Sequence, residues 1–281
     1  MKVWDRCVSR SANAGTPSKS QGVLSQASSI LVNRPTISLL FFALAALESL
    51  ILTALFLSHS GTFYKFLGPI IRRLWGERFL HYPDNFLLLP KIYNYEHIFI
   101  LSTLGLLITG IVIKKIETYS AAENQASTLS SAGLAFRKYF SFLLVWIPLY
   151  LLIRSSARFI LPFLSSNPIL QIVGLALLLL FFQCLTAFIF PSIIISGKGF
   201  IRAVVDGIGL ALKNIHKLAV LLFIPVFLSV AMSYAKAMAP QWITGEPDFV
   251  LYLLYAGIFV AYAVDAFVTV VATLLYLKVR T

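Results

Sequence analysis

Six apolar runs of about 20 residues or more constrain the fold of this chain more than any other feature. A run of that length crosses the hydrocarbon core of a membrane as an α-helix, because a helix satisfies its backbone polar groups without water. Only 12% of the 281 residues are charged, whereas a soluble domain averages ~25%. We therefore predict an all-α, polytopic membrane protein. The six predicted spans cover residues 36–58, 97–116, 140–162, 168–190, 215–236 and 250–277.

A sequence pattern that recurs along the chain predicts how the spans are grouped. Gly-Leu-Ala-Phe-Arg at 133–137 and Gly-Leu-Ala-Leu-Lys at 209–213 each lead into an apolar run that carries an Ile-Pro pair. A fainter third copy covers 24–35. Two spans follow each copy, so we predict that residues 22–281 form one membrane domain of three helical hairpin repeats in the same orientation.

Each repeat begins with a mildly amphipathic stretch, at 22–33, 118–137 and 199–215. We expect each stretch to form an interfacial amphipathic helix that turns sharply into the following span. The pattern is clearest in the third stretch, where apolar residues recur at helical spacing. They are Ile201, Val204, Val205, Ile208, Leu212 and Ile215.

The positive charge of the chain predicts its orientation in the membrane. If the N-terminus is cytoplasmic, 15 of the 23 Lys and Arg residues fall on the cytoplasmic side of the predicted spans, so the positive-inside rule places both termini there. Residues 1–21 are polar and basic, and we expect a disordered cytoplasmic tail. The net charge of +12 is then explained by topology and by contact with anionic lipids, without a nucleic-acid partner.

The segment 60–96 is the longest stretch outside the predicted spans, and its first part is amphipathic. We expect a helix on the outer leaflet, broken at Gly68-Pro69, with a cap that binds a partner as the alternative. Basic and aromatic side chains in this helix and in 199–215 are the candidates for contact with lipid headgroups. They are Arg72, Arg73, Trp75, Arg202 and Lys213.

Charged and polar side chains inside the spans are the candidate functional residues, because an ionised side chain at the bilayer centre costs ~2.5–3.5 kcal/mol on insertion scales. We expect them to face the interior of the bundle, either as structural pairs or along a pathway for an ion, proton or anionic solute. The most probable structural pair by depth is Glu48 with Arg154. Contact with an anionic lipid is a further alternative for Arg158. The candidates are Glu48, Arg154, Arg158, Gln183 and Asp265.

No catalytic motif occurs in the sequence. The P-loop, the Gly-x-Ser-x-Gly elbow and the His-Glu-x-x-His zinc motif are all missing. Glu96, His97 and His59 fall at the ends of the first two predicted spans, but their spacing matches no metal motif. We therefore predict no catalytic residue, no metal site and no cofactor, and a cavity lined by these three residues would be needed to revive an enzyme hypothesis.

The junctions Asn33-Arg34-Pro35 and Leu210-Ala211-Leu212-Lys213-Asn214, each between an amphipathic stretch and a long apolar hairpin, resemble a loose set of uncharacterised prokaryotic six-span membrane proteins. They also resemble the membrane domain attached to some glycerophosphodiester phosphodiesterases. This resemblance implies the fold and the membrane location. It implies no catalytic residues, since the catalytic barrel of those enzymes has no counterpart in this chain.

These observations predict a non-enzymatic integral membrane protein that organises lipids or a partner protein. A transporter or channel for a small solute or ion, using the charged residues within the spans, is the alternative. Membrane lipids are the expected partners, with a protein partner or a second copy of the chain as further possibilities. The expected location is a prokaryotic cytoplasmic membrane.

Overall fold

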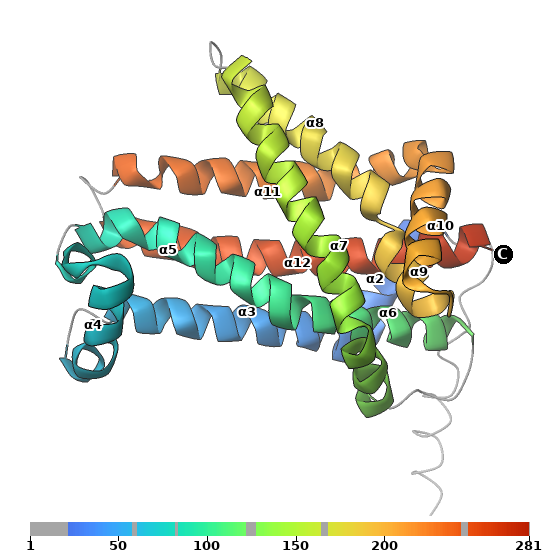
Figure 1. Cartoon of the computed structure of the whole chain (residues 1–281), viewed down its shortest axis with the longest axis horizontal. Coiled ribbons are helices and arrows are strands. Elements are labelled where there is room, and N and C mark those ends of the chain that lie inside the picture. The colour runs from blue at the N-terminus through green and yellow to red at the C-terminus, as the bar shows by residue number, and fades with distance from the viewer. Residues whose placement is uncertain are drawn as a thin grey trace, which may run out of the picture.

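The computed structural model describes residues 22–57, 61–81, 84–121, 128–163, 168–242 and 247–280. These residues are almost entirely helical and contain no strand, as the sequence predicts (Figure 1). The predicted tail at 1–21 and His59 lie outside the described residues.

The helices follow one another along the chain with short connections. In order they are α2 (Val23–Asn33), α3 (Pro35–Phe56), α4 (Gly61–Trp75), the 3₁₀-helix η2 (Glu77–Leu80), α5 (Asp84–Ile100), the π-helical turn η3 (Leu101–Gly105), α6 (Leu106–Ser120), α7 (Thr128–Phe163), α8 (Pro168–Thr186), α9 (Ile189–Ile195), α10 (Phe200–Lys213), α11 (Ile215–Trp242) and α12 (Pro247–Arg280).

Six helical segments are long and apolar enough to cross a membrane, and each contains most or all of one predicted span. The second is a single rod made of α5, η3 and α6, so this span begins nearer Leu88 than residue 97. The architecture is that of a multi-pass α-helical membrane protein. The segments are Pro35–Phe56, Leu88–Ser120, Thr128–Ser156, Ile169–Ile195, Ile215–Lys236 and Phe249–Arg280.

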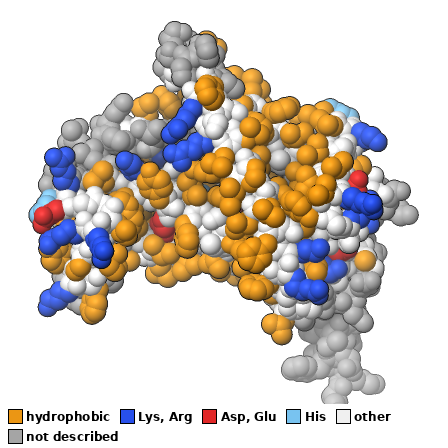
Figure 2. Space-filling view, in the orientation of Figure 1, with side chains coloured by type: hydrophobic (Ala, Val, Ile, Leu, Met, Phe, Trp, Pro, Cys, Tyr) orange, Lys and Arg blue, Asp and Glu red, His pale blue; other side chains and the backbone are white. Residues whose placement is uncertain are grey.

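Helix α12 lies at the centre of this bundle, and α7 lies at its periphery. The apolar window of α12 is 56% buried, whereas that of α7 is only 6% buried. α12 packs against α3, α6 and α11, and α7 runs obliquely across the bundle against α6 and α8 (Figure 1). A broad band of apolar side chains covers the middle of one face, with Lys and Arg gathered towards its left and right edges (Figure 2).

Two of the three expected turns into a span are present as breaks between helices. Arg34 separates α2 from α3, with Pro35 in the first turn of α3, where its missing N–H costs nothing. Asn214 separates α10 from α11, and its side-chain amide donates to the carbonyl oxygen of Leu210 at 3.1 Å. The prediction of a third break, between the stretch 118–137 and the following span, is wrong, because α7 runs from Thr128 to Phe163 without interruption. Its residues 128–147 include no proline, and Gly133 alone does not end a helix.

One end of the bundle is tied together by contacts between helix ends. The guanidinium of Arg34 lies 4.7 Å from the ring centroid of Tyr119, near the end of α6. Arg280, the last described residue, donates to the carbonyl oxygen of Ile195 at 3.1 Å. The starts of α3 and α10 and the ends of α6, α9 and α12 therefore share this end, where α2 also lies (Figure 1).

Helix α4 and η2 fold over the opposite end of the bundle. Gly76 connects them with φ of +88°, a conformation that glycine adopts without strain. Ile71, Phe79 and Leu80 are buried and join the core that α3, α5 and α12 share. The prediction of a break at Gly68-Pro69 is wrong, since α4 continues through Pro69. The helix lacks only the one backbone N–H that a proline cannot supply.

Close packing of α10 on α9 depends on the absence of a side chain at Gly207. A Cβ on Gly207 would lie 3.0 Å from the Cα of Ile189 and 3.1 Å from the carbonyl oxygen of Phe188, both backbone atoms. We expect Gly207→Ala to lower the free energy of unfolding by about 1–3 kcal/mol, the usual effect of overpacking. Gly209→Ala in the same helix is the control, because its Cβ would meet nothing within 4 Å. Thermal unfolding in detergent checks the pair, and a Tm for Gly207→Ala at or above that of Gly209→Ala would contradict the prediction.

Candidate functional site

A fully buried carboxylate, that of Glu48 in α3, lies at the centre of the candidate site. Its Oε1 is 2.7 Å from Nδ1 of His97 in α5, and its Oε2 accepts a hydrogen bond of 2.6 Å from the hydroxyl of Tyr262 in α12. His97 donates to the ionised carboxylate, since a carboxylate only accepts. Both oxygens are therefore paired, which is what a buried charge requires. Three different helices meet at this one side chain.

The antiparallel packing of α3 on α12 brings Glu48 and Tyr262 together. A second contact between the same helices joins the hydroxyl of Thr53 to that of Tyr255 at 2.6 Å. Moving forward along α3 thus corresponds to moving backward along α12. Glu48 is the fourteenth of the 22 residues of α3, so the contact falls well inside the span rather than at its end.

Further ionisable and aromatic groups surround this carboxylate. The ring of Tyr93 stacks on His97 with 5.7 Å between centroids, and the Nζ of Lys236 in α11 lies 5.0 Å from the Tyr93 centroid. Both Glu96 carboxylate oxygens are buried without a hydrogen-bond partner among the described residues. Lys236 and Glu96 both interact electrostatically with Glu48. We call Glu48, Tyr93, Glu96, His97, Lys236 and Tyr262 the buried polar cluster.

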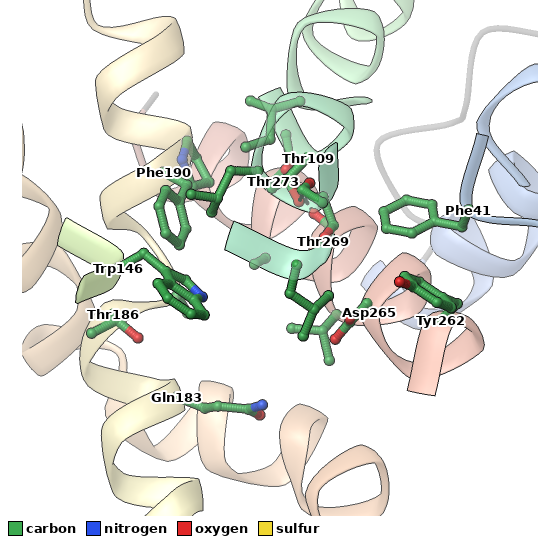
Figure 3. Close-up of a pocket in the computed structure, with 18 of the residues that line it drawn as sticks. Phe41, Thr109, Trp146, Gln183, Thr186, Phe190, Tyr262, Asp265, Thr269 and Thr273 are labelled. Carbon is green, nitrogen blue, oxygen red and sulfur yellow. Dashed lines mark hydrogen bonds between the residues drawn. The ribbon is translucent and has the colours of Figure 1, made fainter. Parts of the chain in front are cut away.

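A cavity of about 240 Å³ adjoins the buried polar cluster. It lies between α3, η3, α6, α7, α8, α9 and α12, and Tyr262 belongs to both sites because its ring lines the cavity while its hydroxyl binds Glu48. Asp265, one turn further along α12, directs its carboxylate into the same space, with Gln183 and Trp146 across from it (Figure 3). Its other polar lining residues are Thr109, Thr186, Thr269 and Thr273.

Three of the residues predicted as intramembrane candidates lie at these two sites. Glu48 is in the buried polar cluster, and Asp265 and Gln183 line the cavity. The other two, Arg154 and Arg158, are exposed on the peripheral helix α7. The predicted pair of Glu48 with Arg154 is wrong, because α5 rather than α7 packs against α3 and supplies His97 instead. Arg154 donates to the hydroxyl of Tyr150 at 3.0 Å.

The candidates for lipid contact are all exposed at their side chains. Arg72, which also forms an ion pair of 3.1 Å with Glu77, lies on α4 with Arg73 and Trp75. Arg202 and Lys213 are exposed on α10. The small residues Ala203, Gly207 and Ala211 are the buried residues of α10, and Val204 and Ile208 of the apolar stripe are partly buried beside them.

Sequence reasoning missed the partners of Glu48. Tyr262 and Tyr93 resemble ordinary aromatic residues of a span, and Lys236 falls at the end of the fifth span, where a basic residue is common. The sequence places His97 at the start of a predicted span, in a group with Glu96 and His59 whose spacing matches no metal motif. One feature of the sequence could have identified His97. It lies between Tyr93 and the apolar residues of the second span, and a histidine inside a span is itself a functional candidate.

The described residues contain no group of three or more His, Cys, Asp or Glu side chains that could hold a metal ion. The cavity is lined by neither Glu96 nor His97.

The fold and the two sites define a multi-pass α-helical membrane protein with a buried ionisable cluster next to a cavity. Comparisons with protein-family models, with curated proteins and with solved structures found no match to this chain. The resemblance to the membrane domain of glycerophosphodiester phosphodiesterases therefore stays a prediction.

Proposed function

We propose that the protein is a transporter that couples the movement of a small solute to that of protons. The observation that carries this proposal is the contact of Tyr262 with both sites, since this residue joins the Glu48–His97 pair to the cavity. Ionisable side chains within spans are costly, and they commonly mark proton relays and substrate pathways in transporters. The solute binds in the cavity, and Glu48 with His97 exchanges the proton.

The proposed coupling acts through charge and through Tyr262. Asp265 interacts electrostatically with both Glu48 and His97, so a change of charge in the cavity alters the balance of protons between them. When Glu48 gains a proton, Oε1 and Oε2 no longer act as two equivalent acceptors, and the hydroxyl of Tyr262 can turn away from it. A shift of Tyr262 changes the wall of the cavity, which makes the affinity for solute depend on the proton.

The proposal is tested with proteoliposomes that contain a pH-sensitive dye and whose membrane potential is clamped with potassium and valinomycin. Three solutes of similar size and different charge are added outside in turn: methylguanidinium, methylurea and methanesulfonate. We expect at least one of them to change the lumenal pH faster than in protein-free vesicles. No difference from protein-free vesicles with all three solutes would contradict the proposal.

A second candidate function, the organisation of lipids at the membrane, is favoured by the outer face of α10. Ile201 and Val205 are 74% and 63% exposed, and they lie on the side away from the small residues that pack on α9. We propose that α2 and α10 lie in the membrane interface as parts of a repeated hairpin, with Arg202 and Lys213 near anionic headgroups and both termini in the cytoplasm.

Native mass spectrometry after gentle extraction tests this second function. We expect the wild-type protein to retain an anionic lipid, and the Arg202→Gln/Lys213→Gln variant to retain less of it, because the basic side chains supply about 1 kcal/mol each near an anionic surface. Equal retention by the two proteins, or a bare wild-type protein, would contradict a lipid-organising role for α10. Arg154→Gln, on the peripheral helix α7, is the matched control.

A further inference from the structure

We propose that the cavity binds a small organic cation and that Asp265 is its counter-charge. This substrate class rests on the transport function proposed above, and it follows from the polar groups that the cavity walls present. The oxygen atoms of Asp265, Gln183 and three of the four threonines are available only as hydrogen-bond acceptors.

Three of the four threonine hydroxyls of the cavity wall already donate their protons to backbone carbonyl oxygens. Thr109 donates to the carbonyl oxygen of Gly105 at 2.9 Å, Thr186 donates to that of Phe182 at 2.8 Å, and Thr273 donates to that of Thr269 at 2.7 Å. Each of these bonds stays within its own helix. What remains for a bound solute is the lone pairs of each hydroxyl oxygen, so the threonines act as acceptors.

Two stronger acceptors face the same space without a donor of their own. The carboxylate of Asp265 forms no hydrogen bond or ion pair with the described residues, and the Oε1 of Gln183 is buried without a partner among them. None of the described residues that line the cavity is Lys, Arg or His. His97 interacts with the Asp265 carboxylate electrostatically but does not bind it, so a cation in the cavity would supply the direct partner that a buried charge requires.

The remaining wall suits an organic cation with N–H donors. The indole of Trp146 lines the cavity and is held in place by stacking on Tyr150, with 5.3 Å between centroids and 3° between ring planes. An indole face attracts cations, and it does so more strongly away from water. The volume of about 240 Å³ is slightly below the ~300–1,000 Å³ of sites for drug-sized ligands, so the solute is small.

An anion is disfavoured here because Asp265 and Glu48 would both repel it. A neutral donor such as a urea satisfies the same acceptors but leaves the charge of Asp265 uncompensated. Methylguanidinium and methylurea share size and shape and differ in charge, so their difference in affinity isolates the contribution of Asp265.

Calorimetric titration of the full-length protein in detergent tests the proposal directly. We expect methylguanidinium to bind at least tenfold more tightly than methylurea, and Asp265→Asn to remove at least that tenfold preference. Asp206→Asn is the matched control, since Asp206 lies on α10, where it is paired with Lys198 outside the cavity. Equal affinities of the two solutes for the wild-type protein, or an unchanged preference in a folded Asp265→Asn variant, would overturn the proposal.

A second variant keeps the test decisive if Asp265→Asn does not fold. Gln183→Glu places another carboxylate on the cavity wall and is expected to raise the affinity for methylguanidinium at least threefold, with no gain in affinity for methylurea. The absence of that gain for methylguanidinium would overturn the proposal.

Proton movement driven only by methylurea or methanesulfonate would retain the transport function and reject the cation. Tight methylguanidinium binding without solute-driven proton movement would retain the cation site and reject transport.

Discussion

Glu48→Gln is expected to reduce solute-driven proton movement roughly 100-fold or more, the lower end of what a positioned proton-transfer group contributes. The glutamine is nearly the same size as the glutamate, and its amide oxygen can still accept the hydrogen bond from Tyr262. Its amide nitrogen faces His97, but an amide does not exchange a proton at neutral pH. The assay is the dye-loaded proteoliposome measurement, using the solute that is active with the wild-type protein.

The control for this variant is Glu77→Gln, which removes an exposed carboxylate paired with Arg72 at the far end of the bundle. It should transport as the wild-type protein does. We expect the Tm of Glu48→Gln to stay within a few degrees of the wild-type value, so that lost transport is not lost folding. Wild-type transport by Glu48→Gln would show that Glu48 has a structural role alone.

Glu48→Ala is expected to lower the free energy of unfolding by about 3–5 kcal/mol, as the loss of one partner from a buried charge pair does. The change leaves Nδ1 of His97 and the hydroxyl of Tyr262 without their acceptor, and it leaves a small void between α3, α5 and α12. Unfolding in increasing proportions of an anionic detergent, followed by circular dichroism, measures this difference.

Glu96→Ala is the control in the same cluster. The Glu96 oxygens have no hydrogen-bond partner among the described residues, and Glu96 lies close enough to Glu48 for their charges to interact. Removing a buried carboxyl group without a hydrogen-bond partner also removes the cost of its burial, so we expect this variant to be as stable as the wild type or more so. A loss for Glu96→Ala as large as that for Glu48→Ala would mean that the hydrogen bonds to Glu48 contribute little.

The all-helical architecture and the six apolar helices could be predicted from sequence because the requirement for a long apolar run is local. Local breaks were harder to predict. Arg34-Pro35 ends one helix and begins another as expected, whereas 128–147 continues into the third span because tertiary packing against α6 and α8 imposes no turn there. Pro69 stays inside α4, which the buried contacts of Ile71 help to hold on the bundle.

The candidate site could be predicted in part. Glu48 and Asp265 stand out because a carboxylate in a span is rare and expensive. Their partners depend on which helices are neighbours, and sequence depth alone favours Arg154 as readily as His97. Thr109, Thr186 and Thr273 matter only because three helices converge on one cavity, and no local pattern distinguishes them from other threonines in spans.

The π-helical turn η3 sets the angular phase between the two halves of the second span. His97 and Thr109 are twelve positions apart, so at about 100° per residue an unbroken α-helix would hold them about 120° apart around its axis. A π-turn takes about one residue more than an α-turn, which sets the second half back by about 100°. The two side chains then differ by only about 20°: His97 packs against the ring of Tyr262 in α12, and Thr109 lines the cavity that Tyr262 also lines. One additional residue in the turn thus places the histidine that contacts Glu48 and a threonine that lines the cavity on the same side of one continuous helical rod.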